Sequence, residues 1–364
     1  MQMERDIISL LSLLRIALCQ QVENLGKDIN WQKVNALAVN QGVRGIAFEG
    51  LELLARNNAL ENLPSREVLL KWFAQSSLVE QKYKQHKKQA IEFTMFLKKY
   101  GIKTIVFKGL AHSRYYIKPC YREFGDFDCY LIDEHGFSAY KKGNLIAKEN
   151  GFTVDDSWYK HSKISFRNLT IENHRYITSA RRGGTDELLN CYLVRSIGNG
   201  HELEKLDGTD IYVLPIEAEG LFMLYHSLGH FLVENINFRH FIDWACWIKT
   251  NQDKIQWADF YAQCKLYRLD GFVDVMNTIA VKYLGVELHD KTVFSDSPYA
   301  ERTIESTLYN YVSKYKHNNG CWYERFDVVR NALKHYWKYR DVARYSMIGY
   351  MWQFVHGLIR KKED

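Results

Sequence analysis

The sequence predicts an α+β protein in which a small mixed β-sheet is flanked by helical regions on both sides. Apolar residues recur at helical spacing over residues 1–100 and again after residue 215. Short β-branched or alternating runs gather between residues 101 and 214. The chain has only 4 prolines in 364 residues, which favours long helices. We therefore expect an N-terminal helical region over 1–100, an α/β core over 101–214 and a C-terminal helical domain over 215–364.

The N-terminal region predicts amphipathic helices that end in one long helix. The helical spacing is clearest in two groups of residues: Ile7, Leu10, Leu11 and Leu14, and then Trp31, Val34, Leu37 and Ala38. Residues 65–100 contain neither proline nor glycine, and Gly101 follows as a stop signal. One uninterrupted helix over this stretch is the expectation.

The predicted core contains three strands, one short helix and one hairpin. The strands are expected at 102–107 (IKTIVF), 127–132 (FDCYLI) and 169–177 (LTIENHRYI), and the helix at 110–116, before Pro119. Residues 201–214 resemble a hairpin, because Asp207-Gly208 separates two apolar runs.

The composition limits which classes of protein are compatible with the sequence, but it does not identify a function. The net charge is +6, which permits an anionic substrate and does not require nucleic acid. Seven cysteines occur with no CxxC pair, which indicates reduced thiols in a cytoplasmic protein and neither a disulfide framework nor a zinc site. No secretory signal opens the chain, and the apolar segment 345–359 is too short to span a bilayer.

The chemistry is expected at Gly125-Asp126-Phe127-Asp128. Alternate residues of a strand point the same way, so Asp126 and Asp128 present two carboxylates to one side. Two such groups repel each other unless a cation lies between them, and their hard oxygen ligands suit Mg²⁺ or Mn²⁺. The same DxD pattern also occurs in solvated turns and in sugar-nucleotide-dependent glycosyltransferases. A glycosyltransferase would need an extended nucleotide-binding α/β domain before the motif, where this sequence predicts helices.

Two further features support a site there. Lys108-Gly109 ends the first strand, where backbone N–H groups and a positive side chain can meet a phosphate. Glu172 alternates with the apolar residues of the third strand, so it must be solvated, paired or bound to a metal. It is either a third metal ligand or a surface residue on an edge strand.

The segment 107–132 resembles the signature of the uncharacterised nucleotidyltransferase family within the polymerase-β-type superfamily. The matching residues, in order, are Lys108, Gly109, Tyr116, Pro119, Arg122, Gly125, Asp126 and Asp128. Further along, Glu172 and His174 are similar to the family's acidic strand, and His226, His230 and Asp243 to its later helices.

The resemblance implies a fold and a reaction. It implies transfer of a nucleotidyl group from a nucleoside triphosphate to an unknown small-molecule or macromolecular acceptor, with two divalent metal ions. Asp126, Asp128 and Glu172 would be the catalytic, metal-binding residues, and Lys108, Gly109, Arg122 and Gly125 would bind the nucleotide.

The sequence departs from the superfamily pattern in three places. Leu110 follows Gly109 where a phosphate-binding serine is usual, the third acid is glutamate instead of aspartate, and Cys129 replaces an aliphatic residue. These departures keep open a second hypothesis, a catalytically degenerate binding or scaffold protein with the same fold.

The remaining polar residues are given structural roles. His226 and His230 share one helix face and are expected to pack between the helical domain and the core, although this spacing can also bind a metal. Asp243 is expected to pair with Arg239, one turn earlier.

Basic and aromatic residues interleave near the end of the chain. They are Lys314, Tyr315 and Lys316, and then Lys334, Tyr336, Trp337, Lys338, Tyr339 and Arg340. Such a surface can bind a nucleic acid strand, but Glu324, Asp327 and Asp341 dilute it, so nucleic acid is the lesser candidate partner.

Overall fold

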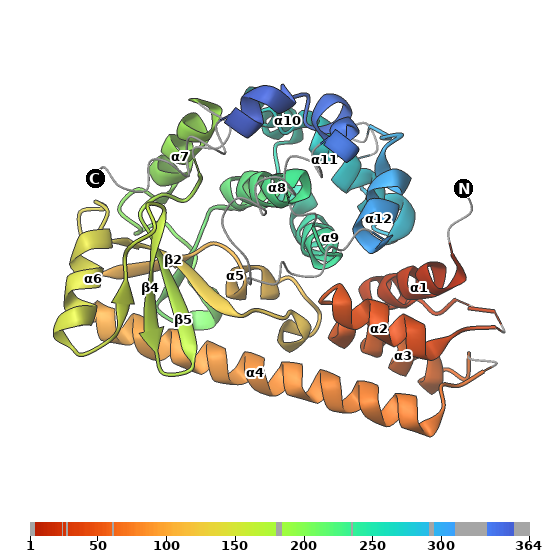
Figure 1. The fold of residues 1–364 in the computed structure, drawn as a ribbon. Coiled ribbons are helices and arrows are strands. Elements are labelled where there is room, and N and C mark those ends of the chain that lie inside the picture. The colour runs from red at the N-terminus through yellow and green to blue at the C-terminus, as the bar shows by residue number, and fades with distance from the viewer. Residues whose placement is uncertain are drawn as a thin grey trace.

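Six strands form one mixed sheet, and helices precede, interrupt and follow it (Figure 1). The computed structural model describes residues 4–23, 25–26, 28–59, 62–179, 184–233, 236–290, 295–309 and 333–352. This architecture confirms the predicted α+β class, with a mixed sheet between helical parts.

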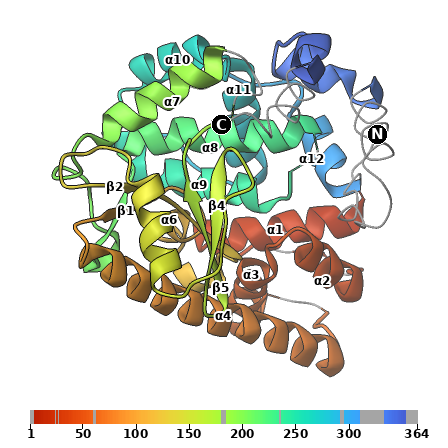
Figure 2. The same cartoon turned by 60° about the vertical axis from the view of Figure 1, so that its left-hand side comes forward.

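Four helices precede the first strand, as expected from the spacing of the apolar residues. They are α1 (Arg5–Cys19), α2 (Trp31–Asn40), α3 (Arg44–Arg56) and α4 (Arg66–Lys98). Ser65 caps α4 by accepting a hydrogen bond from the Val68 amide, and Gly101 follows with φ 72°. The long helix is therefore confirmed, and it passes beneath the sheet in both views (Figure 1 and Figure 2).

The sheet has the strand order β3-β4-β5-β2-β1-β6. The strands are β1 (Lys103–Val106), β2 (Asp126–Ile132), β3 (Val154–Asp155), β4 (His161–Phe166), β5 (Leu169–His174) and β6 (Ile211–Val213). The pairs β2–β5 and β1–β6 are parallel, whereas the other three pairs are antiparallel. All three strands expected in the core are present, shorter or shifted by a few residues.

Alternation of side chains gives the sheet two buried faces. Val106, Phe127 and Ile171 belong to the core shared with α4 and α6 (Tyr140–Glu149). Phe107 and Tyr130 belong to the larger core that joins the N-terminal and C-terminal helices. Asp128, which lies between Phe127 and Cys129 in β2, therefore faces the C-terminal helices.

The C-terminal helices are built around α8 (Ile216–Val233) and α9 (Arg239–Asn251), which are the two most central helices. Among their buried residues, Trp244 and Trp247 stack with ring centroids 4.7 Å apart. The surrounding elements are α10 (Trp257–Leu266), α11 (Asp270–Thr278), a π-helical turn η5 (Ile279–Tyr283), α12 (Ala300–Tyr309) and a second π-helical turn η7 (Lys338–Val342). Figure 1 shows α10, α11 and α12 arranged around α8 and α9.

Four elements were not predicted: β3, β4, α6 and α7 (Gly184–Ile197). In β4 the buried side chains are Ser162, Ile164 and Phe166. Only two of these three are apolar, so the strand shows little of the alternation between apolar and polar residues that predicts a strand. The short helix predicted over 110–116 is α5, which spans only Leu110–Ser113. The 3₁₀ turn η1 (Pro119–Tyr121) follows it.

The predicted hairpin over 201–214 is half wrong. Asp207 and Gly208 both have positive φ, 47° and 70°, as the tight turn requires. Residues before the turn form no strand, however, and only a single bridge joins Lys205 to Tyr212. The segment forms the 3₁₀ turn η3 (Leu206–Gly208) in place of a strand, and β6 pairs instead with β1 in the sheet.

The basic and aromatic segment near the end is only partly described, because residues 314–316 lie outside the described residues. Within the described part, Trp337, Lys338 and Tyr339 are buried. Two of the three aromatic rings at 336–339 are therefore unavailable for stacking on bases. No helix in the described part of the chain has the length and hydropathy needed to cross a bilayer.

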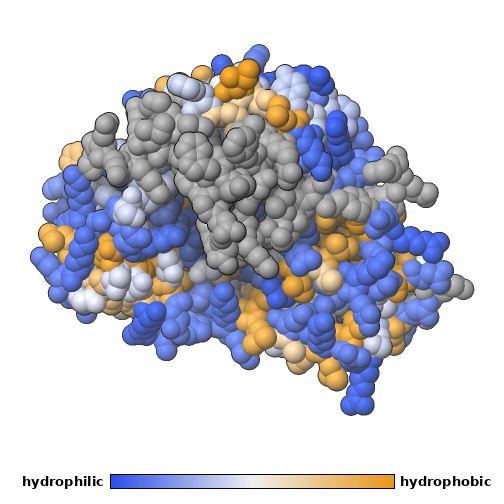
Figure 3. Space-filling view, viewed as in Figure 1, coloured by the Kyte–Doolittle hydropathy of each residue, from blue (hydrophilic) through white to orange (hydrophobic). Residues whose placement is uncertain are grey.

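The surface is mixed in polarity, and the face in Figure 3 shows apolar patches scattered among polar residues. In α4, Leu70, Phe73 and Leu78 are exposed.

Candidate active site

A glycine turn at the end of β1 brings Lys108 to the start of β2. Gly109 has φ 59° and ψ −104°, a conformation that favours glycine. A Cβ there would also lie 3.3 Å from the Cβ of Phe124. The tight turn places the Lys108 Nζ 2.5 Å from Oδ1 of Asp128, on the neighbouring strand.

The parallel pairing of β2 with β5 brings the predicted carboxylates together. Asp128 lies directly opposite Glu172, and Asp126 lies opposite Thr170. Lys108 forms an ion pair with Asp128, and the charges of Asp126 and Glu172 also act on its ammonium group. Of the sequence-predicted residues, Lys108, Asp126, Asp128 and Glu172 therefore meet at one place. Gly125, which precedes Asp126, has open space around its Cα.

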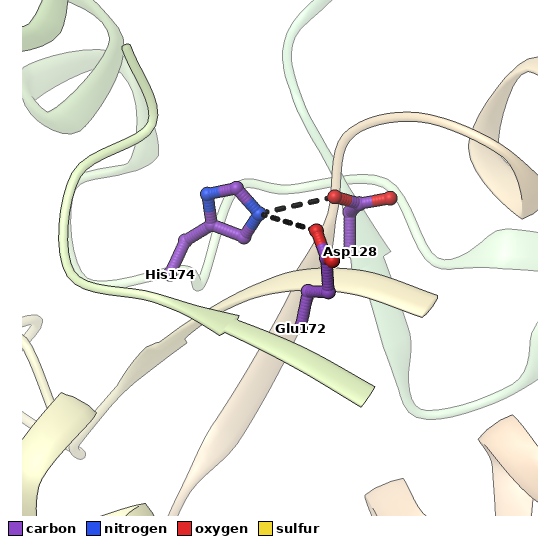
Figure 4. A group of neighbouring side chains, drawn as sticks. All are labelled: Asp128, Glu172 and His174. Carbon is purple, nitrogen blue, oxygen red and sulfur yellow. Dashed lines mark hydrogen bonds and ion pairs between the residues drawn. The ribbon is translucent and has the colours of Figure 1, made fainter. Parts of the chain in front are cut away.

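His174 completes the group from the end of β5. Its Nε2 lies 3.0 Å from Oδ1 of Asp128 and 3.8 Å from Oε2 of Glu172 (Figure 4). Within the described part of the chain, these three residues form the one group with ligand atoms close enough to hold a metal ion, all within 4.8 Å of one another. Two carboxylates and an imidazole are a donor set that fits a divalent cation. Asp126 lies beside this group and is not a member of it.

His161 on β4 is a site residue that sequence reasoning missed. Its Nε2 lies 3.6 Å from Oε2 of Glu172, and its ring centroid is 5.0 Å from that of His174. The antiparallel pairing of β4 with β5 places His161 opposite His174. A sequence prediction of this pairing would have found His161.

The electrostatics of the site are set by burial and close charges. Burial would disfavour the Lys108 ammonium, but Asp128 and Asp126 outweigh it and raise its pKa. Burial would likewise raise the pKa of Asp128, yet Lys108 and His174 lower it below its usual value. Burial and the charge of Asp128 raise the pKa of Asp126. Burial also lowers the pKa of His161 to about 4, so that its imidazole is neutral at pH 7. A cation bound beside Asp126 would favour its ionised form and so lower this raised pKa.

Arg122 lies beneath the site in a buried ion pair. Its Nη2 donates to Oδ2 of Asp243 at 2.7 Å and its Nε to Oδ1 at 3.1 Å. The Asp243 carboxylate also accepts a hydrogen bond from the Tyr116 hydroxyl at 2.7 Å. The expected pairing of Asp243 with Arg239 is therefore wrong, because Arg122 occupies the carboxylate and Arg239 donates to the carbonyl of Glu123.

A second buried ion pair involves Arg114, the residue directly after α5. Both guanidinium Nη atoms of Arg114 bind Glu219 of α8, at 2.9 and 2.7 Å. His112 lies between the two pairs, 3.8 Å from Glu219 and 3.5 Å from Asp243. Because these contacts join the segment from α5 to η1 with α8 and α9, they hold the face of the sheet that carries the carboxylates against the C-terminal helices.

A cavity of about 300 Å³ opens beside the carboxylates. Lys108, Glu172, His161 and His174 line the sheet side. The opposite wall comes from Ser179, Asp186 and the α8 residues Tyr225, His226, Gly229 and His230, and the remaining lining residues include Trp158, Tyr159, Lys160 and Tyr350. Arg122 is not among the lining residues.

His226 and His230 therefore face the cavity as well as pack between the helices and the core. Their ring centroids are 4.6 Å apart, and the ring of His226 stacks on Phe222. Burial, together with His230 and Lys108, lowers the pKa of His226 well below its usual value. The sequence favoured the packing role for these side chains, with metal binding as the alternative.

Comparison with known proteins agrees with this geometry. The sequence model of a family described as uncharacterised nucleotidyltransferase matches residues 27–285. No curated protein and no solved structure matches the chain. The match covers more than half of the 364 residues and includes every residue of the carboxylate site. The chain therefore belongs to the uncharacterised nucleotidyltransferase family.

Proposed function

We propose that this protein transfers a nucleotidyl group from a nucleoside triphosphate to a hydroxyl or phosphate acceptor. The observation that carries the proposal is the cluster of Asp126, Asp128 and Glu172 near Lys108, in which Lys108 and Glu172 line a cavity. Family membership supports the reaction class, and the buried carboxylates support a divalent cation. The acceptor is left open, since one site architecture serves many substrates.

Each residue of the site has a proposed task. Lys108 and the backbone N–H groups around Gly109 and Gly125 bind the phosphates of the nucleotide. The acceptor oxygen attacks the α-phosphorus, the bond to the bridging oxygen breaks in line, and pyrophosphate leaves. Glu172 takes the proton of the acceptor. Arg122, held by Asp243, positions the turn before Asp126 and does not reach the nucleotide.

Asp126, Asp128 and Glu172 would hold Mg²⁺ or Mn²⁺. Such ions, when bound, supply charge neutralisation of the triphosphate and lower the pKa of the attacking hydroxyl. The residues around them contribute orientation, because catalysis of this kind depends on positioning and charge.

A catalytically degenerate binding protein is the second candidate. Two observations favour it: the Lys108 ammonium lies 2.5 Å from Asp128, beside the oxygen that a metal would use, and Leu110 follows Gly109. Such a protein would bind a triphosphate through Lys108 and release it unchanged.

Two labels on the triphosphate separate these candidates. The full chain is incubated with Mn²⁺ or Mg²⁺, with triphosphates labelled at the α- or γ-phosphorus, and with fractionated small molecules as acceptors. We expect the α-label to enter a larger product while the γ-label leaves as pyrophosphate, and Asp126→Asn to abolish both. Release of labelled orthophosphate alone, or retention of intact triphosphate with every fraction, would contradict nucleotidyl transfer.

A further inference from the structure

His174 is oriented in the way that metal-binding histidines usually are. Its Nδ1 lies 3.2 Å from the carbonyl oxygen of Tyr176. A carbonyl oxygen can only accept a hydrogen bond, so Nδ1 carries the proton and donates it. In the neutral ring, Nε2 then presents its lone pair. This arrangement, in which the second ring nitrogen donates to a backbone carbonyl, fixes the tautomer of metal-binding histidines in many proteins.

That lone pair faces two carboxylates. Nε2 of His174 lies 3.0 Å from Oδ1 of Asp128 and 3.8 Å from Oε2 of Glu172 (Figure 4). The ligand atoms of His174, Asp128 and Glu172 all lie within 4.8 Å of one another, so one cation can contact all three. The Lys108 ammonium lies 2.5 Å from the same Oδ1 atom of Asp128, and a metal ion bound there would take its place.

The spacing suits a metal ion. An ion that binds two ligand atoms at about 2.0–2.2 Å holds adjacent ligands roughly 3–3.6 Å apart. The observed 3.0 and 3.8 Å lie close to this range. The side chains of His174 and Asp128 are each only 1% exposed and that of Glu172 is 12% exposed. Little rearrangement is therefore needed for the three residues to bind one ion.

We infer that His174 is a direct metal ligand and that the site selects a divalent transition metal over Mg²⁺. Imidazole nitrogen is a good ligand for iron, nickel, copper or zinc, and Mn²⁺ accepts it more readily than Mg²⁺, which prefers oxygen ligands and retains its waters. A set of one nitrogen and two carboxylates therefore favours the transition metals. This inference rests on the proposed function only in assuming that the carboxylates bind a divalent cation.

The neighbouring rings hold the imidazole of His174 in place. The edge of the ring meets Phe107, with centroids 4.8 Å apart at 86°, and the ring of His161 lies beside it. Both contacts hold the imidazole plane while leaving Nε2 directed at Asp128. His161 offers a matched control, because it lies equally close to Glu172 but outside the three-residue group.

The test is pulsed electron paramagnetic resonance of Mn²⁺ bound to the full chain, without nucleotide. We expect coupling to one imidazole nitrogen in the wild-type protein, changed in frequency when the protein carries ¹⁵N-histidine. His174→Gln should remove this coupling, and His161→Gln should retain it. The wild-type spectra stand even where a variant folds poorly. Absence of nitrogen coupling in the wild type, or its persistence in His174→Gln, would overturn the inference.

Affinities provide the second readout. By calorimetry, His174→Gln should weaken Mn²⁺ binding at least about tenfold while changing Mg²⁺ binding by less than about threefold. Equal losses for both ions would mean that His174 only orients Asp128, which would overturn metal selection.

Failure of the inference is distinguishable from failure of the proposed function. Nitrogen-coupled Mn²⁺ with no nucleotidyl transfer would leave the inference standing and reject the function. Transfer with Mg²⁺ in a protein that shows no nitrogen coupling would do the reverse.

Discussion

Asp128 is the most constrained residue of the candidate site. It is 1% exposed, and a single oxygen, Oδ1, meets both the Lys108 ammonium and the His174 ring. A buried carboxylate needs such partners, because loss of one leaves an uncompensated charge. The residues around Asp128 therefore determine both the stability of the metal-free protein and its affinity for cations.

Lys108→Met should make the metal-free protein less stable and more dependent on metal. Removing the ammonium leaves Asp128 underpaired, at a cost of about 3 kcal/mol, and a bound Mn²⁺ ion would take the place of the lost charge. Thermal unfolding with and without Mn²⁺ measures both effects. Lys163→Met is the control, because Lys163 is 56% exposed and its contact with Glu172 spans 3.9 Å. A variant whose stability in Mn²⁺ rises no more than that of the wild type would contradict the assigned role of Lys108.

Asp274, which lies outside the candidate site, should make the stability of the protein depend on pH. Burial, with a smaller contribution from Asp270, raises its pKa to about 6. Because the folded state then binds a proton more readily than the unfolded chain, stability contributed by this group is present at pH 4 and is lost as pH rises through 6. Asp274→Asn should therefore stabilise the protein at pH 7 by about 1 kcal/mol, a value reduced for partial exposure, and by almost nothing at pH 4. Urea titrations at both pH values measure the difference, and an equal effect at the two would contradict the shift.

At the scale of elements, buried charges connect the sheet to the helices. The Arg122–Asp243 pair joins the turn before β2 to α9, and the Arg114–Glu219 pair joins α5 to α8. These contacts come from residues more than a hundred positions apart in the chain. They hold the carboxylate site on the sheet against the helices that form the far wall of the cavity.

Arg122→Met should be strongly destabilising, by about 3–5 kcal/mol, because it leaves the Asp243 carboxylate buried without its main partner. The double variant Arg122→Met, Asp243→Leu should lose clearly less than the sum of the two single changes, since both charges are then absent. Chemical denaturation of the four proteins completes the cycle. Additive losses would mean that the pair contributes no coupling energy.

Helix packing in the N-terminal region depends on one close approach. A Cβ at Gly50 in α3 would lie 2.1 Å from the carbonyl oxygen of Leu13 in α1, so Gly50→Ala must push the two helices apart. We expect a loss of about 2–3 kcal/mol. Gly229→Ala is the matched control, because Gly229 is also inside a helix but has open space around it, and it should gain roughly 0.5–1 kcal/mol. The same sign for both variants would contradict this account of the packing.

At the scale of the whole molecule, the sequence predicted the α+β class and which side chains share a face of a strand. The DxD alternation placed Asp126 and Asp128 on one face, and the alternation in β5 put Glu172 and His174 together. Both predictions are local, because a strand turns its side chains with a period of two. The long helix α4 was likewise predictable from an uninterrupted helical stretch.

The rest depended on contacts between distant parts of the chain. Asp243 had an arginine one turn away, yet it pairs with Arg122, 121 positions earlier. His161 enters the site only because β4 pairs with β5, and β4 was too polar to be predicted as a strand. The wall formed by Asp186, Tyr225 and His226 requires the packing of α7 and α8 beside the sheet, which no local pattern specifies.

The central claim is that these carboxylates form a metal-dependent nucleotide site, and ligand-induced stabilisation tests it most directly. Thermal unfolding is measured with each of the four nucleoside triphosphates, with and without Mn²⁺ or Mg²⁺, for the wild type and for Asp126→Asn, Asp128→Asn. A triphosphate at about 100 times its Kd should add about 2.7 kcal/mol, a shift of a few degrees for a chain of this length. We expect a shift that needs the metal and is absent in the double variant. Equal shifts in both proteins, or no shift with any triphosphate in a cooperatively folded protein, would contradict the claim.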